Sequence, residues 1–568
     1  MYCVNIKVLL LLELCIAYSF GDEVIIQLPD GLVKGRTETT ATNTIFYSFT
    51  GIPYAQPPLG HLRFQAPLPV EPWDGIWDAT YERNICYQVT LDTDSESEDC
   101  LIINVYTPVD PSSNASLPVM FFIYGGGYNS GSSERILYGP DYFMFYDVIL
   151  VTFNYRLGPF GFLSTGDDLI PGNAGLKDQN MALQWVQKNI EYFGGDPEKV
   201  TIFGESAGAS SVGYQILSPK SEGLFRAAIA ESGSALCPWA YQRNQVGYTF
   251  KTAGYINSTF TSGNATSSDL LQFLTNVTAR EIDEASATLV ATETPEYLQI
   301  QQGFFYAPVI EHDHDGAFIT EKMYESLKNG EFNAVPLITG INSEESLWWF
   351  DEKDSKNIAE TFDNNISLLV PLDMNIEDIE IKEKAGTEVK EIYSPHANFT
   401  ENILVMFKYF SDQSFMRPII KLAELLSNFT DVFFYEFSFT GPLGCVSDES
   451  VDGFSDAVRH GEELYYLFAR YCYRTGVYFN DTSKFPETDV LVHKRFIKMF
   501  TDFAKTLNPT PEKSELLENI IWPKVSDGDF PYLDIGSTSV VTNHPRNITY
   551  GKWEMIYEKY GEGRFDTY

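Results

Sequence analysis

The stretch VTIFGESAGAS, residues 200–210, places a β-branched and aromatic run directly before the motif GESAG. The run Val200–Phe203 is typical of a buried strand, and the residues from Ala207 toward Leu217 can form a helix. Glycines two positions before and after Ser206 permit a very tight turn between these elements. The pattern therefore predicts a nucleophile elbow, in which a strained turn presents the serine oxygen beside a helix N-terminus. A plain glycine-rich turn between a strand and a helix is the alternative interpretation.

The chain on both sides of this motif alternates strand and helix patterns. Short apolar runs separated by Pro and Gly over residues 24–80 predict an opening antiparallel region. The alternation after residue 101 predicts an α/β fold, with a mostly parallel central sheet, helices on both faces and one domain over residues 21–568. Polar stretches at 256–280 and 361–400 are expected to be surface excursions. The candidate strands and helix are VMFFIY (119–124), VILVTFNY (148–155), DQNMALQWVQKNIEYF (178–193), KVTIF (199–203), RAAIAESGS (226–234) and VPLITGINSEES (335–346).

The composition of the 568 residues indicates an acidic, globular protein. There are 39 Lys and Arg against 78 Asp and Glu, which gives a net charge of −39. This charge argues against nucleic acid or an anionic membrane as a partner. Residues 1–20 contain Lys7, an apolar run from Val8 to Ala17 and small residues near Ser19, as expected for a secretory signal peptide. No later stretch reaches the roughly 18 apolar residues that span a bilayer, so we expect a secreted protein with no membrane anchor.

Sequons and cysteines agree with export. Cys86 and Cys100 flank a short acidic loop that is easily bridged in an oxidising compartment. A second bridge between Cys445 and Cys472 is possible, and it would leave Cys237 free and buried. The nine N-x-S/T sequons, predicted as glycosylation sites, are Asn114, Asn257, Asn264, Asn276, Asn365, Asn398, Asn428, Asn480 and Asn547.

A nucleophilic serine needs a base, and the base needs an orienting acid. His460, in DAVRHGEELYYLF, follows a small Gly-containing segment and precedes a helical apolar face, a position able to present an imidazole. A capping or merely buried histidine is the alternative there. The acid is expected just past the strand of ITGINSEES, where Glu344 and Glu345 compete and spacing does not choose between them. The other histidines are weaker candidates for the base. His61 precedes the serine in the chain, and His396 is expected to be exposed. The H-x-H pair of EHDHD is more typical of a solvated loop than of a metal site.

The transition state of acyl transfer also needs hydrogen-bond donors for an oxyanion. Gly125 to Gly127, in FFIYGGGYNSG, follow a strand and can bring their N–H groups close to such an oxygen. The N–H of Ala207 adds a further donor. A phosphate-binding loop is the rival interpretation, but the Lys-Ser/Thr ending is missing and the acidic surface would repel phosphate.

Taken together, these segments resemble type-B carboxylesterases, the cholinesterase-like branch of the α/β hydrolases, and especially secreted arthropod venom and integument-type enzymes. The resemblance covers nearly the whole mature chain. It is carried by GIPYAQPPLGHLRFQAP, SEDCLIINVYTP, YGGGY, NYRLGPFGFLS, PGNAGLKDQNMALQWVQKNIEYFGGDPEKVTIFGESAG, FRAAIAESGS, GINSEES, HGEEL, FAKTLNP and IWP.

The resemblance implies an α/β-hydrolase fold and a catalytic triad of Ser206, Glu345 and His460. It also implies oxyanion donors at Gly126, Gly127 and Ala207, supporting residues at Glu205, Ser232 and Glu463, and a Cys86–Cys100 bridge. Each of the three supporting residues could instead be structural. The expected reaction uses an acyl-enzyme and requires neither a metal nor a cofactor. Aromatic residues that match pocket-lining positions are Trp239, Phe304, Phe305, Trp348 and Trp349, although core packing is an equal alternative for each.

Departures from the family pattern bear on the substrate. Tyr124 stands where many esterases have His, as in cholinesterases, but the loop from Cys86 to Cys100 lacks the Trp that binds choline in those enzymes. Juvenile hormone esterases typically have Gln where this chain has Glu205. We therefore expect a small-molecule ester substrate of small to medium size without charge. The alternatives are a hormone or choline esterase, and a catalytically silent adhesion or binding protein on the same fold.

Overall fold

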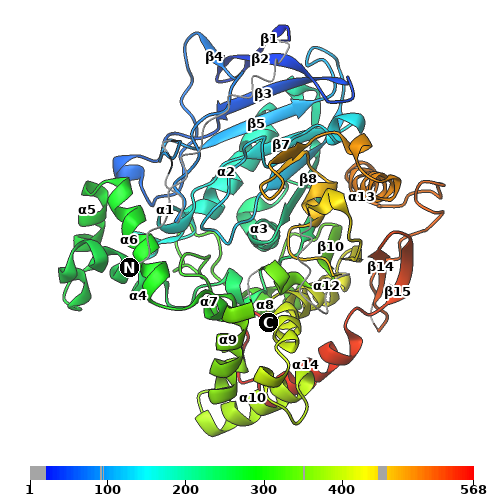
Figure 1. Ribbon diagram of the computed structural model, residues 1–568. Coiled ribbons are helices and arrows are strands. Elements are labelled where there is room, and N and C mark those ends of the chain that lie inside the picture. Colours follow the sequence, from blue (N-terminus) through cyan, green and yellow to red (C-terminus); the bar gives the residue numbers. More distant parts are fainter. Residues whose placement is uncertain (1–20, 90–92, 94, 349–351, 446–456, 527) are drawn as a thin grey trace, which may run out of the picture.

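The computed structural model describes residues 21–89, 93, 95–348, 352–445, 457–526 and 528–568. The signal peptide predicted at residues 1–20 lies outside these ranges. The described residues form a 13-stranded sheet with the order β1-β2-β3-β5-β7-β6-β8-β9-β10-β11-β14-β15, and β4 pairs with β2 at its side. Figure 1 shows this sheet twisting through the molecule, with the N-terminal strands at one end and β14 and β15 at the other.

The N-terminal end of the sheet is antiparallel, as predicted for residues 24–80. Strands β1 (Glu23–Leu28), β2 (Gly31–Thr39), β3 (Ile45–Pro53) and β5 (Ile102–Thr107) pair antiparallel in that order. The short strand β4 (Ile76–Asp78) instead joins β2 in parallel.

The rest of the sheet is parallel from β7 to β14. In spatial order it contains β7 (Ile149–Phe153), β6 (Leu117–Ile123), β8 (Gly195–Glu205), β9 (Ala227–Glu231), β10 (Leu337–Asn342), β11 (Val432–Phe437) and β14 (Pro531–Ile535). Strand β15 (Ser539–Asn543) closes this end in antiparallel orientation. Because the carboxyl ends of parallel strands meet at one edge, residues that follow β6, β8 and β10 come together there.

Helices cover the parallel strands on both sides. Figure 1 shows α2 (Ala174–Asn189) and α3 (Ala207–Leu217) on one side and α13 (Glu487–Thr506) on the other. Aromatic rings of α13 pack on alternate residues of β11, as in the contacts of Phe496 with Tyr435 and Phe437. These contacts bury the sheet face that alternate strand residues share.

One sequence expectation on helices needs correction. Helix α2 begins at Ala174 rather than near Asp178, because Asn173 is fixed by side-chain hydrogen bonds to Val309 and Glu311 and so starts the helix one turn earlier. The polar stretches 256–280 and 361–400, for which surface excursions are expected, include helices α5 (Ser267–Asn276) and α10 (Ile379–Tyr393), and α5 starts with a capping box at Thr266. The remaining α-helices are α1 (Gly158–Phe162), α4 (Gln245–Ile256), α6 (Ala279–Thr292), α7 (Glu296–Gln302), α8 (Met323–Asn329), α9 (Glu352–Asn364), α11 (Leu404–Ser411), α12 (Arg417–Ser427) and α14 (Asn547–Tyr560).

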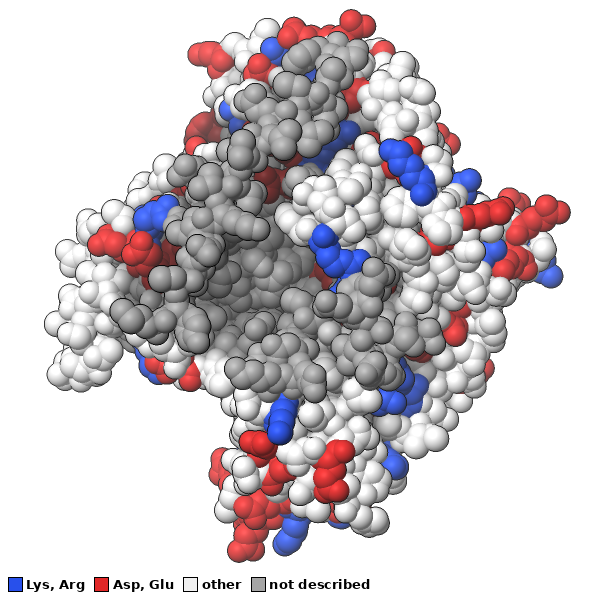
Figure 2. Space-filling view, viewed as in Figure 1, with Lys and Arg blue, Asp and Glu red and all other residues white. Residues whose placement is uncertain are grey.

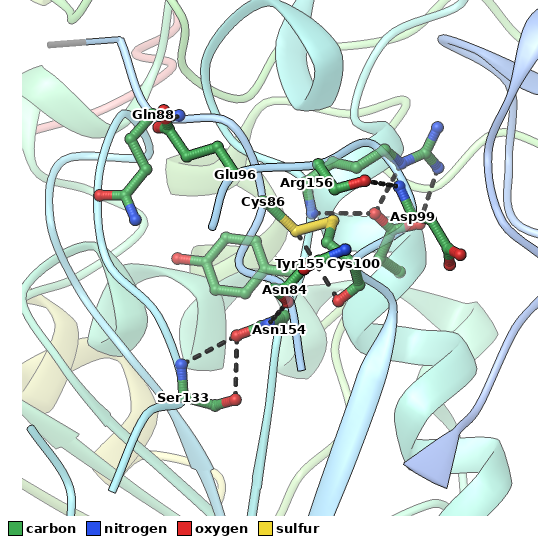
Figure 3. Close-up of a disulfide and its surroundings, with 12 residues drawn as sticks. Asn84, Cys86, Gln88, Glu96, Asp99, Cys100, Ser133, Asn154, Tyr155 and Arg156 are labelled. Atoms are coloured by element: carbon green, nitrogen blue, oxygen red, sulfur yellow. Dashed lines mark hydrogen bonds and ion pairs between the residues drawn. A yellow bond between two sulfur atoms is a disulfide. The ribbon is translucent and has the colours of Figure 1, made fainter. Parts of the chain in front are cut away.

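Disulfides tie loops to this frame. Cys86 is bonded to Cys100, and Cys445 is bonded to Cys472, while Cys237 is free and buried, as the sequence allowed. Figure 3 shows the first bridge beside Asn154, whose Oδ1 accepts hydrogen bonds from the N–H and hydroxyl of Ser133.

The surface carries the acidic excess. On the face shown in Figure 2, acidic side chains gather at the top, right and lower edges of the molecule. All nine sequon asparagines are at least partly exposed; Asn257 and Asn480 are half-buried and the other seven are exposed. No helix in the described ranges is long and apolar enough to cross a membrane.

Candidate active site

Ser206 occupies a strained turn between β8 and α3. Its backbone has φ 59° and ψ −123°, a region that a residue with a side chain rarely adopts, and its N–H donates to the Glu231 carbonyl over 2.9 Å. A Cβ on either Gly204 or Gly208 would collide with the carbonyl oxygen of Ile123 at the end of β6. The two glycines of the motif are therefore required by close backbone packing, and they fix the turn that projects the serine.

Glu345 and His460 form a hydrogen-bonded pair beside this turn. His460 Nδ1 lies 2.7 Å from Glu345 Oε2, and the second carboxylate oxygen accepts the N–H of Asn342 over 2.7 Å. Glu344 points elsewhere, with Oε1 3.4 Å from Arg546 Nη2. Of the two candidates for the acid, Glu345 is therefore the one that contacts His460. His460 lies in a turn before the short 3-10 helix η13 (Glu463–Tyr466), not before an α-helix.

Glu205 contacts the other ring nitrogen of His460. Its Oε1 lies 3.1 Å from His460 Nε2, and both side chains are buried. Burial lowers the pKa of His460, but the carboxylates of Glu205 and Glu345 outweigh it and raise the pKa to about 9. Burial raises the pKa of Glu205. The imidazole is therefore held between two carboxyl groups that favour its charged form.

A deeper carboxyl group completes this cluster. Glu463 accepts hydrogen bonds from the Ser232 hydroxyl, over 3.3 Å, and from the side-chain amide of Asn342. Burial, together with the charges of Glu205 and Glu345, raises the pKa of Glu463 to about 8. Glu205, Ser232 and Glu463 thus lie together beside the Glu345–His460 pair.

The glycine loop after β6 lies against the serine. A Cβ on Gly125 would lie 2.9 Å from the Ser206 Cβ, and Gly126 and Gly127 have φ values of 96° and 61°. Neither the Gly126 nor the Gly127 N–H donates a hydrogen bond within the described part of the chain. Ala207 opens α3, so its N–H has no partner inside the helix. These three N–H groups are available to an oxyanion at Ser206.

A cavity of about 950 Å³ connects these groups. Ser206, His460, Glu205 and the glycine loop lie in its wall together with Trp239 and Phe304, two of the aromatic residues expected there. Phe305 instead packs against Tyr248 in the core. Trp349 and the side chain of Trp348 lie outside the described residues.

Phe415 and Arg470 are among the residues of this cavity wall that sequence reasoning missed. Phe415 lies in the π-helical turn η11 (Asp412–Met416), and its ring centroid is 4.8 Å from that of His460. Arg470 comes from β12 (Arg470–Cys472), ten residues after His460. Neither position carries a sequence signal, because a π-turn and a two-stranded ribbon of three-residue strands leave no periodic pattern.

The other histidine candidates lie away from the cavity. His61 and His396 are exposed, and His312 is mostly exposed. His314 Nε2 lies 3.3 Å from Glu311. Within the described ranges, no three His, Cys, Asp or Glu side chains are grouped to hold a metal ion.

Comparison with known proteins places the chain in a family. The model of the carboxylesterase family matches residues 22–553. The chain belongs to the carboxylesterase family. Juvenile hormone esterase of Tribolium castaneum is 33% identical over 85% of the chain and 84% of its own length. Venom carboxylesterase-6 of Apis mellifera is 32% identical over 94% of both chains. This carboxylesterase also superposes on the crystal structure of juvenile hormone esterase from Manduca sexta with OTFP covalently attached, with a TM-score of 0.80, 28% identity and coverage of 94% and 100%.

The family membership bears on two expectations. An α/β-hydrolase fold is established by this superposition and by a second one, on PNB esterase, with a TM-score of 0.74 and 28% identity over 93% and 99% of the two chains. The carboxylesterase is accordingly a carboxylic ester hydrolase by family, which does not favour the alternative of a silent binding protein.

Proposed function

We propose that this carboxylesterase is a secreted serine hydrolase that cleaves small to medium, uncharged carboxylic esters through an acyl-enzyme. The observation that carries the proposal is the meeting of the strained Ser206 turn, the Glu345–His460 pair and the unpaired glycine-loop N–H groups in one cavity. The covalent OTFP adduct of the Manduca sexta relative supports a covalent route.

In the first half-reaction, His460 Nε2 accepts the hydroxyl proton of Ser206 as its oxygen attacks the ester carbonyl. The N–H groups of Gly126, Gly127 and Ala207 bind the resulting oxyanion. The tetrahedral intermediate then collapses, His460 gives the proton to the departing alcohol, and the acyl group remains on Ser206. Glu345 holds the imidazole through Nδ1 and stabilises its charged form.

In the second half-reaction, His460 accepts a proton from water, which attacks the acyl carbonyl. A second tetrahedral intermediate releases the carboxylic acid and returns the proton to Ser206. Phe415, whose ring is tilted against the imidazole, and Trp239 cover this part of the cavity wall with apolar surface. No step requires a group beyond the side chains and backbone of this chain.

Secretion is supported by three features of the chain. Two disulfides are typical of an oxidising compartment, and all nine sequons are accessible to glycosylation. The apolar run in residues 1–20 fits a signal peptide. We therefore place the functional enzyme outside the cell.

Replacement of the serine tests this function. The full chain and its Ser206→Ala variant are expressed in insect cells and recovered from the medium, where the N-terminus is expected near residue 21. We expect the variant to fold but to lose turnover of 4-nitrophenyl butyrate by about a millionfold, the typical loss when the nucleophile of such a triad is removed. An organophosphate should label wild type once, at Ser206. Near wild-type hydrolysis by the variant would refute the assignment.

A further inference from the structure

Arg470 is the one Lys or Arg among the described residues that line the cavity containing Ser206 and His460. It opens β12, which pairs with β13 (Val477–Phe479) in a two-stranded sheet apart from the main one. The guanidinium carbon lies 5.2 Å from the ring centroid of Tyr138 and 5.1 Å from that of Tyr465. Two aromatic rings therefore hold a cation in the cavity wall.

Among the described residues, none makes a hydrogen bond or an ion pair with the guanidinium of Arg470. Its Nε and Nη1 atoms are enclosed, yet neither makes a hydrogen bond, and the side chain forms no ion pair with the described residues. Enclosed donors without hydrogen-bond partners are unfavourable, because the loss of their hydration is not compensated. Nη2 is not among the enclosed atoms, and Arg470 as a whole is only partly buried. Arg470 therefore places in the cavity wall a charged group whose hydrogen-bonding capacity the described residues do not use.

The carboxylates in the same wall already have partners. Glu205 contacts His460 over 3.1 Å, and Glu293 is paired with Lys251 and accepts the Tyr255 hydroxyl over 2.9 Å. Arg470 does act on Glu205 at longer range: burial raises the pKa of Glu205, and the charges of His460 and Arg470 oppose that rise. A role as counter-ion to Glu205 is therefore the rival explanation.

We propose that Arg470 binds a carboxylate carried by the ester substrate, so that the cavity accepts half-esters of dicarboxylic acids or esters of carboxylate-bearing alcohols as well as neutral esters. A guanidinium N–H bonds a carboxylate oxygen through a charge-assisted hydrogen bond, and Nη2 is the guanidinium nitrogen of Arg470 that is not enclosed. The net charge of −39 opposes the approach of an anion, but salt screens that field within about 8 Å, whereas contact at Arg470 is local. The inference rests on the proposed Ser206 hydrolase and extends its substrate class from uncharged esters to esters that also carry a carboxylate.

Two matched pairs of esters test this inference. The 4-nitrophenyl half-ester of glutaric acid is compared with its methyl ester, and 4-acetoxybenzoate is compared with methyl 4-acetoxybenzoate. The pairs place a carboxylate on the acyl side and on the alcohol side. We expect Arg470→Gln to reduce the ratio of kcat/KM for the anionic to the neutral ester by about tenfold or more in at least one pair, which is about 1.4 kcal/mol. Arg470→Lys should restore only part of the ratio.

Arg474→Gln is the matched control, because Arg474 is exposed in the turn after β12 and the charge change is the same. It should leave both ratios at the wild-type value. If Arg470→Gln leaves the ratio of kcat/KM for the anionic to the neutral ester unchanged in both pairs, the inference is overturned and the counter-ion role is favoured. An equal loss of kcat/KM for all four esters counts as an unchanged ratio. The proposed function stays intact in that case as long as wild type hydrolyses the neutral esters. Wild type that hydrolyses none of the four would overturn both. If Arg470→Gln does not fold, inhibition of the wild-type enzyme provides the test. We then expect 4-phenylbutyrate, which carries a carboxylate, to have a lower inhibition constant than the neutral 4-phenylbutyramide. Equal inhibition constants would refute the carboxylate site.

Discussion

At the scale of single residues, the position of His460 between two carboxyl groups sets the charge of the site. Glu345 contacts Nδ1 and Glu205 contacts Nε2, the nitrogen that must accept the proton of Ser206. Because their charges raise the pKa of His460 to about 9, the neutral imidazole that acts as a base is favoured at alkaline pH. Activity should therefore rise with pH through this value.

Glu205→Gln tests this electrostatic role. The variant keeps the size of the side chain and removes one negative charge, so the pKa of His460 falls, and the acid limb of kcat/KM should move to lower pH by about one unit. The pH profile of 4-nitrophenyl butyrate hydrolysis measures the shift, with Glu198→Gln, an exposed carboxylate on β8, as the control. An acid limb that stays in place or moves to higher pH would contradict the assignment.

The sequence identifies most, but not all, of these residues. Ser206 can be recognised from Gly204 and Gly208, because close packing against Ile123 permits no side chain at those two positions. Glu344 and Glu345 cannot be separated by pattern, since which of the two faces His460 depends on where the 3-10 turn η7 (Glu345–Trp348) begins. That start is set by tertiary contacts that leave no mark in a local pattern.

At the scale of elements, the loop closed by Cys86 and Cys100 supports the glycine loop. Gln88 makes two hydrogen bonds with the backbone of Gly131, over 3.0 and 2.9 Å, and the Val89 N–H donates to Asn129 over 3.0 Å. The disulfide is therefore connected to the segment that carries the oxyanion donors. The strands are predictable because they are buried apolar runs, whereas the π-turn of Phe415 is not, because a π-turn leaves no periodic pattern in the sequence.

We expect Cys86→Ala/Cys100→Ala to be less stable and less active. A bridge that closes a loop of about 15 residues contributes roughly 3 kcal/mol through the unfolded state, and loosening of the loop should lower kcat for neutral esters. Urea unfolding and steady-state kinetics below the unfolding midpoint measure the two effects. Cys237→Ala, which removes a free buried thiol, serves as the control for loss of a sulfur atom. An unchanged unfolding midpoint in the double variant would contradict the stabilising role.

At the scale of the whole molecule, the net charge of −39 attracts cations, but salt screens it within about 8 Å. A quaternary ammonium gains roughly 0.5–2 kcal/mol from an aromatic face, and the loop from Cys86 to Cys100 contains no Trp to supply it. Arg470 in the cavity wall adds a repulsive charge. The net charge therefore attracts a cationic substrate to the molecule, whereas the cavity itself disfavours binding of the cation.

Choline esters should be the poorer substrates. At 150 mM salt, we expect kcat/KM for butyrylcholine to be below that for its neutral isostere, 3,3-dimethylbutyl butyrate, and the ratio should fall further at 500 mM as the attraction is screened. The lack of one aromatic contact can cost about tenfold in discrimination. A preference for the cation that persists at high salt would show a choline site built from other residues, such as Trp239 or Phe304.

The three residues of the proposed triad follow different parts of the parallel sheet: Ser206 follows β8, Glu345 follows β10, and His460 lies after β11, 115 residues beyond Glu345. Contacts between such distant segments form only when the strands from β8 to β11 are assembled, because their loop-closure entropy must first be overcome. Ester hydrolysis by this chain is consequently a readout of completed maturation. The rate at which a fluorogenic ester is hydrolysed therefore measures the fraction of fully folded molecules in a mixture with folding intermediates. This measurement requires no conformation-specific antibody.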